Sequence, residues 1–181
     1  MKKMEQEALL PLINENTFER VLRDENFVSL RDLVLARIMD VAIESVQGNV
    51  MRVTKIEQGI ELILALNDVE VVDLIIYNRF QKTHEINFYP FMNLQQKELE
   101  IASKKYYCTR RVIVFLDNHN VLGGEDYECE RFIYQSSTRE LSEYPELYYI
   151  DLVTCLKNST NLSFDQYNNY EQLARMLVIA S

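Results

Sequence analysis

The feature that most restricts the fold is a change of pattern before the middle of the chain, where helical spacing gives way to short runs of β-branched and apolar residues. Three such runs, at residues 50–56, 60–66 and 69–77, are predicted strands. Residues 111–117 hold a further run, Val-Ile-Val-Phe-Leu, which is typical of a central strand buried on both faces. The chain is therefore predicted to build a sheet around these segments.

Helical spacing dominates the chain before these strands. Phe18, Val21 and Leu22 recur at the interval of one helix face, with Asn16 as the predicted N-cap. A second helix is predicted from the S-x-x-D start at Ser29, and the stop signal Gly48-Asn49 should end it. The remaining expected elements are helices over residues 93–107 and 164–179, strands over residues 84–89, 128–135 and 147–153, and a turn at residues 67–68.

This order of elements predicts an α/β fold with a central mixed β-sheet flanked by helices. The 181 residues suit a single domain over residues 1–181, with residues 1–15 as a flexible lead-in. No apolar run approaches the roughly 20 residues that span a bilayer, and the start of the chain is too short and acidic for a signal peptide. The expected location is therefore cytoplasmic.

The formal net charge of −9 limits the partners of the surface. DNA repels such a surface unless positive charges gather in one place or metal ions intervene. The charge is compatible with a protein that occupies the basic groove of another protein, and also with an ordinary solvated surface. The sequence lacks the glycine-rich phosphate loops, the H-E-x-x-H zinc motif and the G-x-S-x-G nucleophile motif.

Cysteine and histidine usage argues against a metal site built from these residues. Cys108, Cys129 and Cys155 lie far apart and are odd in number, so they are interpreted as buried or incidental thiols. His84 and His119 are equally isolated.

One group of polar residues has the spacing of a divalent-metal site. Asp73 interrupts an otherwise apolar strand, and Glu85 and Asn87 share one face of the next predicted strand. Carboxylates from two adjacent strands are oxygen ligands of the kind that Mg²⁺ requires, and the metal would activate water against a phosphodiester. The alternative is that Asp73 and Glu85 are ordinary residues on an exposed sheet face.

The α-β-β-β-α-β order, with Asp73 assigned to the second strand, resembles the PD-(D/E)XK nuclease fold, and in particular its Rpn-type, transposase-associated branch. Residues 12–22 are similar to the opening segment of that branch, and Val72-Asp73-Leu74 resembles the strand that carries its metal-binding Asp. Tyr106-Tyr107 followed by residues 111–116 resembles its helix-then-strand passage, and residues 132–149 its closing strands. The resemblance spans roughly residues 12–153.

The resemblance also implies a damaged site. In the family the third core strand carries Glu, one residue, then Gln or Lys. Counted by distance from Asp73, these positions hold Asn87 and Tyr89, which supply neither the anionic ligand nor the group that orients water. Glu85, two residues earlier on the same face, would restore part of the metal affinity.

Two functions follow as expectations. The first is a catalytically decayed nuclease-fold protein, without a cofactor, that acts by binding a protein partner. Such a protein would be a phage- or mobile-element-encoded inhibitor or regulator of a nucleic-acid-handling enzyme. The second is a Mg²⁺-dependent DNA endonuclease with Asp73 and Glu85 as metal ligands and Asn87 orienting water. A purely structural homodimer is a third possibility, and the sequence gives it no specific support.

The densest basic segment lies near residue 107. Lys104-Lys105 and Arg110-Arg111 are positioned to contact phosphates, and Tyr106-Tyr107 to stack on bases. The alternative is a solvated helix end with tyrosines packed at its rim.

Overall fold

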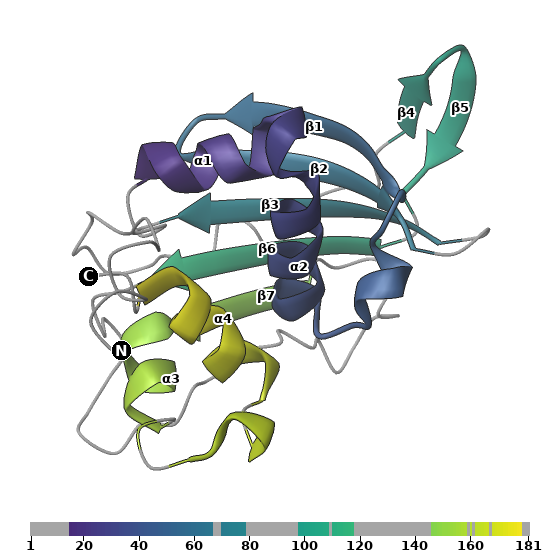
Figure 1. Ribbon diagram of the computed structural model, residues 1–181. Helices are drawn as coiled ribbons and strands as arrows, with labels where there is room; N and C mark the ends of the chain where they lie inside the picture. Colours follow the sequence, from purple (N-terminus) through teal and green to yellow (C-terminus); the bar gives the residue numbers. More distant parts are fainter. Residues whose placement is uncertain are drawn as a thin grey trace, which may run out of the picture.

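The computed structural model describes residues 15–66, 70–78, 98–108, 110–117, 146–158, 160, 162–166 and 168–178 (Figure 1). Its α-helices are α1 (Glu15–Arg23), α2 (Val28–Met39), α3 (Leu152–Asn158) and α4 (Asn169–Val178). Its strands are β1 (Val50–Ile56), β2 (Gly59–Ala65), β3 (Val71–Asn78), β4 (Glu98–Ile101), β5 (Lys104–Tyr107), β6 (Arg110–Asp117) and β7 (Glu146–Asp151).

Five of the strands form one mixed sheet in the order β1-β2-β3-β6-β7. The first three form an antiparallel meander, while β6 runs parallel to β3 and β7 runs parallel to β6. The prediction of an α/β fold with a central mixed sheet and flanking helices is confirmed at this level. The strands expected at residues 50–56, 60–66, 69–77 and 111–117 correspond to β1, β2, β3 and β6.

The helices pack on one face of the sheet, which Figure 1 shows with α1, α2 and α4 in front of the strands. Because side chains alternate between the two faces of a strand, every second residue of β2, β3, β6 and β7 enters this core. Leu62, Leu74 and Val114 pack there with Phe18 and Leu35 from the helices, and all five are buried. Burial of each such side chain stabilises the fold by roughly 1.5–3 kcal/mol.

The α2 helix is shorter than the sequence predicts. It ends at Met39, because Asp40 adopts a left-handed conformation (φ 55°) that its backbone N–H stabilises by bonding to the carbonyls of Ala36 and Arg37. The stop signal at Gly48-Asn49 instead follows a separate short 3₁₀ turn. Asn16 lies inside α1 and is not its N-cap, so that prediction is wrong.

The helix predicted over residues 93–107 is wrong for residues 98–107, where β4 and β5 form an antiparallel hairpin, and residues 93–97 lie outside the described residues. Glu98-Leu99-Glu100-Ile101 alternates polar and apolar residues, which is the period of a strand. The turn residues Ala102 and Ser103 both have positive φ, 50° and 63°. Two left-handed residues give the backbone twist that joins two strands tightly, although neither residue is the usual Gly or Asn. Lys104-Lys105 and Tyr106-Tyr107 therefore lie in a β-hairpin, and Arg110-Arg111 begin β6, so none of them is at a helix end.

The C-terminal elements differ in detail from their predictions. The strand predicted at residues 147–153 ends at Asp151. The Asp151 carboxylate accepts a hydrogen bond from the Val153 N–H at the start of α3, a helix that the sequence does not predict. The helix predicted over residues 164–179 is divided into a 3₁₀ turn and α4. The predicted turn at residues 67–68, the predicted strands at residues 84–89 and 128–135, and residues 1–14 of the lead-in lie outside the described residues.

Two further findings concern the cysteines and the helices. Cys108 is a buried free thiol, as the interpretation of the cysteines as buried or incidental thiols has it, whereas Cys155 in α3 is buried but disulfide-bonded, so that interpretation is wrong for Cys155 as a thiol. Cys129 lies outside the described residues. Within the described segments, no helix has the length and apolar character needed to cross a bilayer.

Candidate functional site

Of the three residues that the sequence assigns to a metal site, the structure places one. Asp73 lies in the middle of β3, which is the third strand along the chain and not the second. Glu85 and Asn87 lie outside the described residues.

Alternation along β3 places Asp73 on the sheet face opposite the helices. Its neighbours Val72 and Leu74 point into the helix-covered core, so Asp73 points the other way. The strand register aligns it with Ile63 of β2 on one side and with Arg111 of β6 on the other. The Asp73 side chain is 0% exposed, so the expectation of an ordinary residue on an exposed face is wrong.

Arg111 neutralises the buried carboxylate. Its Nε donates to Asp73 Oδ2 at 2.8 Å, and its terminal nitrogen Nη2 lies 2.8 Å from the same oxygen. The Arg111 side chain is 16% exposed, so this pair is largely removed from water. A buried carboxylate without a partner would cost several kcal/mol, and a guanidinium at this distance offsets that cost.

A second carboxylate on the same sheet face is also paired with an arginine. Glu61 of β2 is buried, and its Oε2 lies 3.5 Å from Nη2 of Arg52 on β1. In register, Glu61 faces Ile75 on β3, so it is the diagonal neighbour of Asp73. Arg52, Ile63, Asp73 and Arg111 form one row across four strands. We use the name charged row for the four charged residues on this face, which are Arg52, Asp73 and Arg111 from that row and their diagonal neighbour Glu61.

Tyr77 lies on the same face of β3 as Asp73 and Ile75, two residues beyond Ile75. Its ring stacks on Phe115 of β6, with centroids 5.4 Å apart. Burial raises the pKa of its phenol; Arg111 acts in the opposite direction, and the charges of Asp73 and Glu61 raise the pKa further. The Tyr77 phenol therefore keeps its proton to a higher pH than a tyrosine in water does.

The charged row contains equal numbers of carboxylates and guanidinium groups. A Mg²⁺ site requires several oxygen ligands with uncompensated negative charge. Among the residues that the structure describes, no group of three or more His, Cys, Asp or Glu side chains is arranged to hold a metal ion. The described part of this face is thus built for charge pairing between side chains.

Arg110, the residue before Arg111, is paired on the opposite face of β6. Its Nε and Nη2 donate to the two carboxylate oxygens of Glu146 at 2.9 and 2.6 Å, and the Tyr148 hydroxyl donates to the same carboxylate at 2.7 Å. Glu70 lies 3.6 Å from Arg110 Nη1. Bonding to Glu146 raises the pKa of the Arg110 guanidinium above its usual range. This cluster joins the amino ends of β6 and β7 and is a structural clamp.

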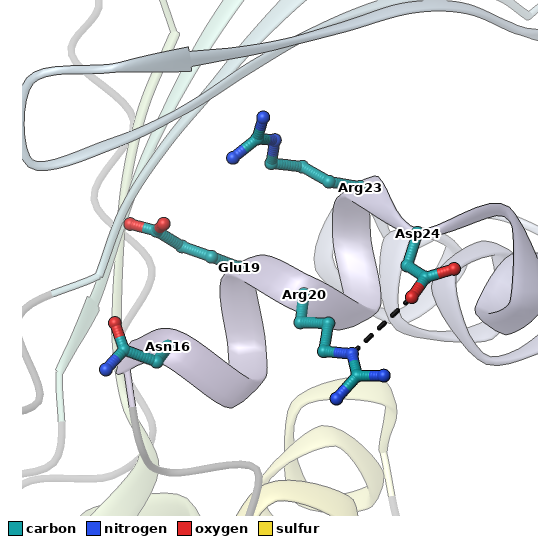
Figure 2. A pocket seen from close by; sticks show the side chains of 5 residues that line it. All are labelled: Asn16, Glu19, Arg20, Arg23 and Asp24. Atoms are coloured by element: carbon teal, nitrogen blue, oxygen red, sulfur yellow. Dashed lines mark hydrogen bonds and ion pairs between the residues drawn. The ribbon is translucent and has the colours of Figure 1, made fainter.

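A surface hollow of about 300 Å³ lies beside α1 and the turn that follows it. It is lined by Asn16, Glu19, Arg20, Arg23 and Asp24, and Figure 2 shows Arg20 directed at Asp24. Arg20 pairs with Asp24 at 3.4 Å, and Glu19 pairs with Lys55 of β1 at 2.8 Å. Its charges are largely compensated and it contains no nucleophile, so it offers less chemistry than the charged row.

Sequence reasoning missed Glu61, Arg52 and Arg111 as partners of this site. Arg52 and Glu61 are single charges flanked by apolar residues, which is the same signal that identified Asp73, whereas Arg111 belongs to the Arg110-Arg111 pair that begins β6. Their pairing depends on which strands are neighbours, and only the folded chain supplies that information.

Comparison with family models, curated proteins and solved structures gives no match to this chain.

Proposed function

We propose that the chain is a PD-(D/E)XK-type domain that has lost its chemistry and acts by binding a protein partner. The observation that carries the proposal is the pairing of the fully buried Asp73 with Arg111 at 2.8 Å. A cation supplied by the chain itself stands beside the carboxylate that a catalytic metal would need.

The order of the strands supports the proposed PD-(D/E)XK relationship more directly than the count of residues from Asp73 does. In the PD-(D/E)XK pattern the second core strand carries an Asp, and the third carries an acid, one residue, then Gln or Lys. The second and third strands here are β2 and β3, and the face opposite the helices bears Glu61 on β2 and Asp73 and Ile75 on β3, with Leu74 between them pointing into the helix-covered core. Ile75 then stands where Gln or Lys is expected, and an alkyl group neither orients nor activates water.

Electrostatics argues in the same direction. Glu61 and Asp73 are each paired with an arginine from an adjoining strand, so a divalent ion would approach two fixed positive charges. The affinity of an oxygen site for Mg²⁺ depends on the net negative charge of its ligands. Binding is therefore favoured over metal-dependent cleavage as the role of this domain.

The charge of the whole chain supports a protein partner. A net charge of −9 disfavours non-specific binding to DNA and favours a surface with positive potential. Enzymes that handle nucleic acid carry such surfaces in their substrate grooves. We infer that the partner is a nucleic-acid-handling enzyme and that the chain is an inhibitor or regulator of it, of the kind encoded by phages and mobile elements.

Cleavage of supercoiled plasmid tests the loss of chemistry. Purified wild type with Mg²⁺ or Mn²⁺ is expected to leave the plasmid intact, as is Asp73→Ala. Metal-dependent nicking by wild type that disappears in Asp73→Ala would overturn the proposal in favour of the endonuclease alternative, with Asp73, Glu85 and Asn87 as its residues.

Binding is tested separately. The tagged chain is used to isolate a partner, which is then purified and assayed on its nucleic-acid substrate with and without the chain. Dose-dependent inhibition or altered activity at stoichiometric amounts is the expected result. A tagged chain that isolates nothing, or a partner whose reaction does not change, would contradict a binding role.

A further inference from the structure

We draw no further inference here: the strongest candidate, the surface hollow beside α1, has only Arg23 as a charged lining residue outside an ion pair, and nothing in the described part of the chain shows what would occupy it.

Discussion

Arg110 and Arg111 are neighbours in β6, and their side chains serve two different regions of the domain. Arg110 lies on the helix side of the sheet in a cluster with Glu146 and Tyr148, where it remains 29% exposed. Arg111 lies on the opposite side against Asp73, whose side chain is 0% exposed. Both arginines pair with a carboxylate at short distance, yet only one of the carboxylates is inaccessible to water.

This difference determines what each pair does. A partly exposed pair retains water around its charges, so losing it removes a modest stabilising contact. A buried pair has already lost its hydration, so removing one partner leaves an uncompensated charge in the interior. The Asp73–Arg111 pair is therefore costly to break.

The largest predicted effect is that of Arg111→Ala. Because Asp73 would remain buried without its cation, we expect the free energy of unfolding to fall by about 3–5 kcal/mol. Urea denaturation measures this change. In the double variant Asp73→Leu, Arg111→Met both charges are absent, and we expect stability closer to wild type than to Arg111→Ala. A loss below about 1 kcal/mol in Arg111→Ala would show that the two regions do not differ.

Arg110→Ala is expected to have a smaller effect, a loss of about 1–2 kcal/mol, since Glu146 becomes hydrated when its partner is removed. The same urea experiment repeated near 1 M salt should reduce this loss, because exposed charges are screened. The loss in Arg111→Ala should change little. Equal salt sensitivity of the two variants would contradict the difference in burial.

The smallest predicted effect is that of Tyr77→Phe at high pH. The raised pKa means that the folded chain keeps the Tyr77 proton after the unfolded chain has lost it. Stability from this group is complete below the unfolded pKa of about 10 and declines as the pH rises towards the folded pKa. Tyr77→Phe should therefore weaken the alkaline loss of stability, measured by thermal unfolding between pH 9 and about pH 11. An unchanged profile would place Tyr77 in water.

The sequence predicts the sheet better than it predicts the site. Residues 50–56 and 111–117 become β1 and β6 because their β-branched and apolar content is a local property. The spacing of Leu94, Leu99, Ala102 and Tyr106 favours a helix over residues 93–107. The alternation in β4 and the positive φ at Ala102 and Ser103 give a hairpin instead.

The partners of Asp73, unlike the strands, cannot be predicted from local sequence patterns. Arg111 lies 38 residues away, and it meets Asp73 only because β3 and β6 run parallel with these residues in register. No local pattern specifies that register across a long connection. The isolated charge at position 73 marked a functional candidate, and the folded sheet identified the cation that neutralises it.

Titration of Mn²⁺ into wild type and Asp73→Asn, followed by calorimetry, tests most directly whether an arginine or a metal neutralises this carboxylate. We predict the same heats for both proteins, with no stoichiometric binding that depends on Asp73, because Arg111 already balances its charge. Stoichiometric Mn²⁺ binding by wild type that is abolished in Asp73→Asn would show a working metal site and contradict the proposed loss of chemistry.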